Sequence, residues 1–421
     1  VYGAWEHRGQ ALPWARATAS WQRQHERRNG LRPASYVVNL GEDDVDTLGL
    51  TAQARLPQAA LAGKPLRLLT GIDSYFDTLR SQASVGFSDI DVIVERSRGQ
   101  YLEGSTYLYG GAFADAELQL APTLRLEGGA RLSWIRAQAP GDQASGTAAI
   151  DEAWFPLVGR LGARWRLAPP LSLLVNLDHS FRAPNLDDLT SRQQTGPGFQ
   201  FENPALGPER ATTLEAGAQV RHARVIADAW AFATLLDGAV GKLSMEARDC
   251  PPNTPQCQAS WNRFKLVNAR SASLLWGVEG AARVQLPWQL QARLSASYAW
   301  GEGPNLAQRP SDPSLPYEER VPLTRVPPLN GTVELYRAPA SGFGGGAALR
   351  WATAQDRLAV ADRSDARIPL GGTPGFAVLD LRASWRLDGQ LAVVGVLENL
   401  FDTAYRYHGS SVNGPGRGLV V

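Results

Sequence analysis

The two cysteines are the residues best suited to covalent chemistry. Cys250 and Cys257 are the only cysteines in the 421-residue chain, and both lie in the proline-rich stretch DCPPNTPQC. Two thiols in one short loop and none elsewhere favour a local disulfide formed in an oxidising compartment. The alternative is a pair of free surface thiols. A zinc site of the CxxC type is not supported, because the spacing is wrong and no histidine lies nearby in the sequence.

The other polar residues show no pattern for catalysis or metal binding. None of the histidines lies within metal-ligand spacing of another; they are His7, His25, His179, His222 and His408. Asp187 and Asp188 are adjacent, so their carboxylates project differently and make a poor acid/base pair. No Ser–His or Asp–His constellation can be assembled from the sequence. We therefore expect no catalytic residues, no metal site, no cofactor and no enzyme activity.

Composition narrows the remaining classes of function. The formal net charge is +1 and no long basic tract exists, so we expect no nucleic-acid partner. No run of eighteen apolar residues is present, which excludes a transmembrane helix but leaves membrane-spanning strands open.

Strict alternation of apolar and polar residues is the strongest structural signal. In WQLQARLSASYAW, residues 288–300, the apolar side chains fall on one parity and the amide, hydroxyl and guanidinium groups on the other. A strand tilted by about 45° covers about 24 Å over the ten steps from Trp288 to Tyr298, which matches the apolar band of an outer-membrane barrel of roughly 25 Å. We expect the apolar face to meet lipid and the polar face to line the interior.

The alternation recurs, and the connections alternate between short turns and long polar loops. We predict sixteen strands, at 14–27, 47–57, 64–77, 104–119, 123–137, 154–167, 171–182, 211–222, 225–237, 272–286, 288–300, 326–337, 343–354, 375–387, 390–401 and 416–421. Short turns at one rim and long loops at the other are typical of outer-membrane barrels. The predicted fold class is therefore all-β, a transmembrane antiparallel up-and-down barrel.

Several segments resemble one family. FRAPNLDDLT (181–190), NPALGPERATTLEAG (203–217), GVEGAARVQL (277–286) and especially ENLFDTAYRYHGSSVNGPGRG (398–418) are similar to the barrel of TonB-dependent outer-membrane receptors. The resemblance implies a 22-stranded barrel in the Gram-negative outer membrane, with a plug domain inside it. It also implies energy coupling to a TonB–ExbB–ExbD complex through the plug. We expect residues 1–421 to be a C-terminal barrel portion that lacks the plug, the first strands and the end of the closing strand.

The resemblance also implies active import of a scarce, large solute bound at the extracellular loops, for which a ferric siderophore is the leading cargo. Because such chelates are often anionic, we predict contacts from loop arginines and aromatic residues: Arg182, Arg192, Arg248, Phe199 and Phe201. A haem receptor of the same family is one alternative, although the segment between FRAP and NPAL contains no histidine. A passive sixteen-stranded porin and a barrel-embedded hydrolase are the others.

Overall fold

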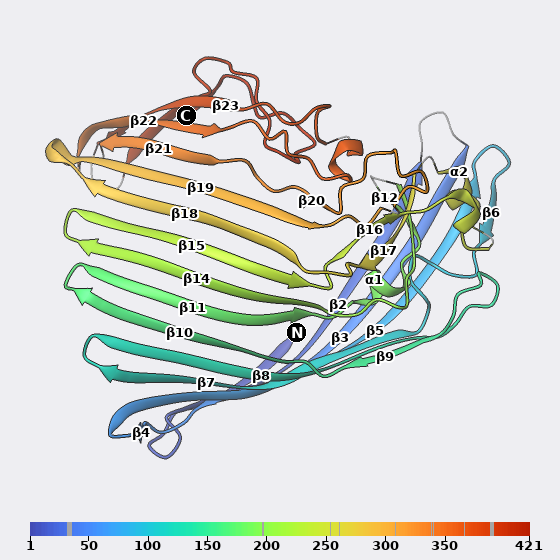
Figure 1. Cartoon of the computed structure of the whole chain (residues 1–421), viewed down its shortest axis with the longest axis horizontal. Helices are drawn as coiled ribbons and strands as arrows, with labels where there is room; N and C mark the ends of the chain where they lie inside the picture. Colours follow the sequence, from blue (N-terminus) through green and yellow to red (C-terminus); the bar gives the residue numbers. More distant parts are fainter. Residues whose placement is uncertain are drawn as a thin grey trace.

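The structure is a computed structural model that describes residues 1–31, 36–195, 198–252, 254–260, 262–307, 309–337, 339, 341–365, 367–387 and 391–421. It is built almost entirely of antiparallel strands (Figure 1). Neither α1 (Leu186–Thr190), α2 (Pro255–Ala259) nor any other helix among these residues has the length and hydrophobicity of a membrane-spanning helix.

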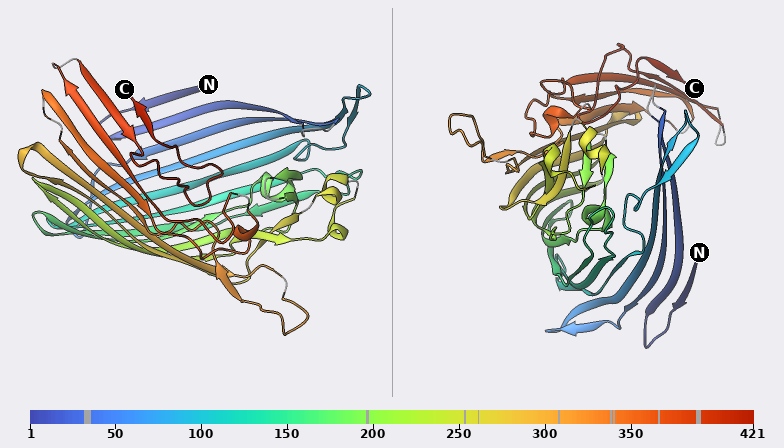
Figure 2. Two further views of the ribbon diagram at one scale, coloured as in Figure 1. Left: turned by 90° about the horizontal axis from the view of Figure 1, so that it is seen from above. Right: turned by 90° about the vertical axis from the view of Figure 1, so that its right-hand side faces the viewer.

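Long strands form one continuous wall, in which each strand pairs antiparallel with the next along the chain. They are β1 (Tyr2–His7), β2 (Trp14–Leu31), β3 (Val37–Arg55), β5 (Lys64–Phe87), β7 (Ser105–Ala121), β8 (Leu124–Ala139), β10 (Leu157–Ala168), β11 (Leu171–Arg182), β14 (Glu209–His222), β15 (Val225–Asp237), β18 (Ser273–Gln285), β19 (Leu290–Pro304), β21 (Asn330–Arg337), β22 (Gly342–Ala352), β23 (Phe376–Arg386), β24 (Ala392–Glu398) and β25 (Gly418–Val420). The wall curls into an incomplete ring, and within the described residues its edge strands β1 and β25 are not paired with each other (Figure 2).

Short strands belong to the loops and turns rather than to the long wall. They are β4 (Ala59–Leu61), β6 (Val92–Glu95), β9 (Ile150–Trp154), β12 (Gln193–Thr195), β13 (Gly198–Phe201), β16 (Val240–Ser244), β17 (Arg263–Asn268) and β20 (Arg320–Pro322). The 3-10 helices are η1 (Ala247–Asp249), η2 (Pro287–Gln289) and η3 (Asp362–Ser364). The tight turns lie at one end of the wall and the long loops at the other, on the left and right of Figure 1.

The all-β antiparallel prediction is confirmed, and the wall contains one strand more than the sixteen predicted. All sixteen predicted strands exist, and the structure adds β1 and the eight short strands above. With β1 included, the wall has seventeen strands within the described residues. The short strands were missed because segments of three to six residues carry too little alternation to be recognised.

Register explains why one face of the wall meets lipid. Cross-strand pairing aligns Leu161 with Leu177 and Leu177 with Leu214, and the same face continues through Trp276 and Leu294 to Val333. These apolar side chains are exposed although they form a continuous surface. A surface of this extent is stable in contact with hydrocarbon rather than water.

The opposite face carries ion pairs that reach across an intervening strand. Arg131 of β8 binds Asp73 of β5 with both Nη atoms, at 2.6 and 2.8 Å, and Arg160 of β10 lies 2.9 Å from Asp115 of β7. Charges of this density belong inside the ring, because lipid cannot solvate them. The parity predicted for residues 288–300 is consistent with this arrangement.

The two faces of β19 provide a direct test. Leu294 is 43% exposed on the apolar face, whereas the Ser295 hydroxyl lies 2.7 Å from Thr332 Oγ1 on the polar face. We predict that Leu294→Arg lowers the free energy of unfolding by about 2–4 kcal/mol, while Ser295→Arg is tolerated. Equilibrium urea unfolding in lipid vesicles measures both, and equal losses would contradict the assignment of the faces.

Candidate functional site

Four long loops pack together at one end of the wall and form what we call the loop cap: residues 88–104, 140–156, 183–208 and 238–272. The cap shares a buried apolar core with the wall ends beneath it, formed by Leu79, Leu102, Ala137, Ala139, Ile150, Leu186, Leu189 and Leu206. Loops of this length rarely acquire a core of their own without a function. The cap therefore has a defined shape on the side opposite the short turns.

The FRAP segment forms the corner by which the chain leaves β11. The Asn185 side chain accepts a hydrogen bond from Asp188 N at 2.9 Å, and Asp188 accepts one from Asn185 N, so the two residues cap the start of α1. Arg182 binds Asp188 at 2.6 Å and also pairs with Glu209 at the start of β14. The predicted cargo contact Arg182 is thus about half exposed and holds the corner together.

Arg98 connects three segments of the cap from a buried position. Its guanidinium donates to the carbonyl oxygens of Gln100, at 2.8 Å, and Thr190, and to Thr147 Oγ1 at 3.1 Å. Burial lowers the pKa of Arg98 to about 10, while the negative charge of Glu202 opposes this shift. The group remains charged at neutral pH. The sequence did not reveal this role, because the Thr190 carbonyl and the Thr147 hydroxyl lie far from Arg98 in the chain.

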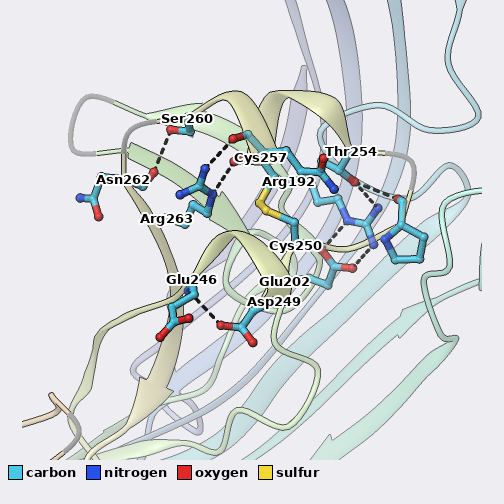
Figure 3. Close-up of a disulfide and its surroundings, with 12 residues drawn as sticks. Arg192, Glu202, Glu246, Asp249, Cys250, Thr254, Cys257, Ser260, Asn262 and Arg263 are labelled. Carbon is cyan, nitrogen blue, oxygen red and sulfur yellow. Dashed lines mark hydrogen bonds and ion pairs between the residues drawn. A yellow bond between two sulfur atoms is a disulfide. The ribbon is translucent and has the colours of Figure 1, made fainter. Parts of the chain in front are cut away.

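The disulfide lies beside a second buried arginine (Figure 3). Cys250 and Cys257 are joined, as the sequence predicts, and Cys257 is fully buried. Arg192 Nε donates to Glu202 at 2.6 Å, and Arg192 Nη1 donates to the Ser145 carbonyl at 3.0 Å. A buried arginine with a bidentate carboxylate partner is rigidly placed. The pair therefore fixes loop 183–208 against loop 140–156.

The predicted aromatic contacts lie inside the cap. Phe199 and Phe201 are 4% and 7% exposed and pack around Cys257, with Met245 against the same cluster. β13, which contains both, pairs in parallel with β17 and so joins two loops into one small sheet. Arg248 differs from them, because its side chain is 79% exposed and its partner Glu246 is exposed as well. The structure does not bring the five predicted contacts together around one opening.

A second cluster attaches the last loop, residues 399–417, to the inner face of the wall. Arg350 of β22 binds Asp380 of β23 at 3.0 and 3.2 Å, and its Nη1 donates to the Tyr407 hydroxyl at 3.3 Å. Buried Asn399 donates to the Thr403 and Pro415 carbonyls, at 2.9 and 3.1 Å. The ENLFDTAYRYHGSS motif therefore contains the residues, Asn399 and Tyr407, that hold this loop in its shape.

A cavity of about 280 Å³ lies between this loop and the ends of β21 and β22. Phe376 and the prolines Pro327 and Pro374 form apolar parts of its lining, and Tyr407, His408 and Arg406 supply polar groups. Arg406 donates to the amide oxygen of Asn413 at 2.7 Å and forms no ion pair within the part of the chain that the structure describes. The cavity therefore combines an aromatic surface with an uncompensated positive charge.

The structure also groups three potential metal ligands that sequence spacing did not reveal. Donor atoms of His25, Glu42 and Asp44 lie within 4.8 Å of one another on β2 and β3. His25 Nδ1 is 3.1 Å from Asp44 Oδ1, and Arg23 lies 3.5 Å from the same oxygen. The carboxylate thus already has two cationic or hydrogen-bonding partners, which compete with a metal ion. Only the pairing of the strands brings these residues together.

An ion-paired inner face, an apolar outer face and long loops at one rim define an outer-membrane β-barrel protein. The model of the family described as TonB dependent receptor-like, beta-barrel matches residues 2–400, and the chain belongs to this family. Its place is the outer membrane of Gram-negative bacteria, and the family and its structural neighbours are transporters and receptors rather than enzymes. No curated protein matches the chain in sequence.

Solved structures share the fold at low sequence identity. The copper transporter OprC aligns with a TM-score of 0.77 and 19% identity, over 98% of this chain and 62% of its own. The ferric yersiniabactin uptake receptor FyuA from Yersinia pestis aligns with a TM-score of 0.64 and 14% identity, over 99% and 58%. The Serratia marcescens hemophore receptor HasR, solved with its hemophore HasA and heme, gives 0.64 and 18%, over 96% and 65%. The chain thus spans about two thirds or less of each neighbour.

The buried Arg192–Glu202 pair generates a prediction about cap stability. Glu202→Gln removes the charge that compensates Arg192, whose side chain is 7% exposed, and a lost partner of a buried charge costs about 3–5 kcal/mol. We expect faster amide hydrogen exchange in β12, β13 and β17 with unchanged exchange in the wall. Glu246→Gln is the matched control, because its partner Arg248 is exposed. Unchanged exchange in Glu202→Gln would contradict the role of the pair.

His408 predicts that the last loop loosens in acid. Burial lowers the pKa of His408, and Arg325 lowers it further against the opposing field of Asp362. Because the folded state then favours the neutral imidazole, its stabilising contribution is present above the unfolded pKa of about 6.5 and is lost as the pH falls below it. The protection factors of residues 399–417, which correct hydrogen exchange for its slower intrinsic rate in acid, should fall between pH 7.5 and 5. His408→Asn, which can keep a hydrogen bond to Thr373, should reduce this pH dependence.

Proposed function

We propose that the protein is an active outer-membrane transporter that binds a scarce, large solute at its extracellular side and imports it with energy supplied through TonB. The observation that carries this proposal is the family match over residues 2–400. The apolar outer face of the wall and the packed loop cap are consistent with it. The proposed energy partner is the TonB–ExbB–ExbD complex, acting through a plug domain that belongs to the longer protein.

A ferric siderophore is the proposed cargo. Arg248 is the most exposed of the predicted arginine contacts, and guanidinium groups pair well with carboxylate or catecholate oxygens. The cavity beside Arg406 offers a second positive and aromatic surface on the inner side of the wall. Both features favour an anionic chelate.

Copper import is less consistent with these residues, although one structural neighbour is named a copper transporter. Copper(I) prefers thiolate and thioether ligands. The chain has one methionine, and its two cysteines are joined in a disulfide. A haem cargo stays an alternative on the strength of the FRAP and NPAL segments, and a passive channel is the alternative mechanism.

Transport is tested in the full-length receptor, expressed in a host that lacks its own siderophore receptors. We expect uptake of a radiolabelled ferric siderophore that disappears when TonB is deleted. Uptake that continues without TonB would indicate a passive channel instead.

The binding surface is tested in the same protein by exchanging loop residues 183–208 for a short Gly/Ser linker. We expect at least a tenfold loss of affinity, measured by ligand-dependent quenching of tryptophan fluorescence. Exchange of residues 309–319, which lie outside the cap, is the control. Heat-modifiable migration on gels shows that each variant still forms its barrel, and unchanged affinity in the first variant would refute the cap as the cargo site.

A further inference from the structure

A hairpin at the outer end of the loop cap stands clear of the membrane. It is formed by the end of β5, residues 84–87, and β6, residues 92–95, and we call it the tip hairpin (residues 84–95). The last large apolar residue on the outer face of β5 is Phe76, and Ser84 lies about 27 Å further along the strand at about 3.4 Å per residue. In Figure 1 β6 lies at the far end of the loop side, near α2. Lipid therefore does not cover this hairpin.

The tip hairpin nevertheless exposes a concentrated apolar surface. Ile90 is 64% exposed, Val92 42%, Ile93 65% and Val94 50%. Tyr36, whose carbonyl oxygen accepts from Ser88 N at 2.8 Å, adds a ring that is 66% exposed. Contiguous apolar residues of this kind on an exposed surface mark an interaction site.

β6 also has an open edge. It pairs with β5 through four residue pairs, and within the described residues no strand lies on its other side. Alternate backbone N–H and C=O groups of an edge strand point away from its neighbour and can pair with another chain. The Val-Ile-Val sequence of β6 has high β-propensity. The neighbouring β3 and β5 pair without a break over their full contact, so the hairpin stands on a rigid base.

The charge of the hairpin limits what can bind it. Asp89, Asp91 and Glu95 are exposed and form no ion pair among the residues that the structure describes. Arg96, the nearest cation in the sequence, donates instead to the Asn39 side chain at 2.9 Å. Three uncompensated carboxylates around four apolar side chains favour a partner segment that is apolar in the middle and basic at its ends.

We propose that β6 is a docking edge for an extended segment of a soluble protein with basic flanking residues, which adds to the sheet as one more strand. Backbone hydrogen bonds to the open edge supply affinity, and the acidic residues select the charge of the partner. This inference goes beyond transport and does not depend on the identity of the cargo.

A second copy of the chain fits the edge poorly. Two receptors in one membrane share their orientation, so a two-fold axis between them runs along the membrane normal. Antiparallel pairing of two identical strands needs a two-fold axis perpendicular to the strands. Barrel strands tilt by only about 35–45° from the membrane normal, so an axis along the normal is not perpendicular to them. The acidic residues of two copies would also face each other.

The test uses the full-length receptor in nanodiscs and a fluorescein-labelled peptide, Lys-Val-Thr-Val-Thr-Val-Lys, followed by fluorescence anisotropy. We expect saturable binding that weakens at least tenfold for a Glu-flanked version of the peptide. It should also weaken at least tenfold when alternate peptide amides are N-methylated, because methylation removes the donors needed for strand addition. Equal binding of the methylated peptide would overturn the proposal.

Variants of the receptor locate the site. Ile93→Pro should abolish peptide binding by disrupting the open edge, and Asp91→Asn/Glu95→Gln should reduce affinity at least tenfold while leaving the hairpin folded. Glu152→Gln/Glu318→Gln makes the same change in charge at exposed positions elsewhere on the loop side and should have no effect. Equal losses in the two double variants, absence of peptide binding, or a dimer that Ile93→Pro dissociates would each refute the proposed partner.

Discussion

The requirement that every backbone amide in lipid has a partner governs this structure. Hydrocarbon offers no hydrogen bonds, so a strand can cross the membrane only if both neighbours complete its ladder. The unbroken antiparallel pairing from β1 to β25 meets this requirement for every strand between the two edges. Once the ladder fixes the register, the period of two along each strand assigns every side chain to the lipid face or to the inner face.

On the inner face of the wall, positive and negative side chains are paired, so many charged groups leave almost no net charge. Arginines of one strand bind carboxylates of the adjacent strand, as in Arg350 with Asp380, or of the next strand but one, as in Arg131 with Asp73. Such pairs contribute little to stability where water reaches them. Their effect is to keep a polar, hydrated surface inside the ring without a strong field of one sign. In Arg350 the same guanidinium also reaches Tyr407, so the wall positions the last loop as well.

The sequence predicted best those strands in which contact with lipid on one face decides the pattern of side chains. β11 and β15 match their predicted bounds, because lipid on one face makes their alternation nearly strict. β2, β3 and β5 extend further than predicted, since their upper parts leave the membrane and the alternation stops. There Asp43 binds Arg28 and Ser81, and Trp21 donates to Asp46, so cross-strand contacts replace the apolar pattern. Local sequence does not show these contacts.

The predicted site was harder, because burial within loops is decided by their mutual packing. Phe199 and Phe201 resemble free loop aromatics in sequence but form the core of a small sheet between two loops. Arg192 resembles a solvent-facing cation but is paired inside the cap. The Cys250–Cys257 prediction needed only the rarity of cysteine, since a short loop leaves one pairing. The sequence therefore predicted the partner of a residue where that partner is nearby or is the one candidate. It did not predict the partner where several distant segments pack against the residue.

The two parts of the molecule depend on different interactions, and this separation has a functional consequence. The wall depends on backbone pairing in lipid, which is nearly independent of which side chains occupy its inner face. The cap depends on Arg98, the Arg192–Glu202 pair, the disulfide and a small apolar core, all of which lie outside the membrane. A change in the cap can therefore alter the shape of the loop side without loosening the strands that hold the protein in the membrane. Solved structures with only 14–19% identity share the fold of this chain, which is consistent with a wall whose pairing does not depend on particular side chains.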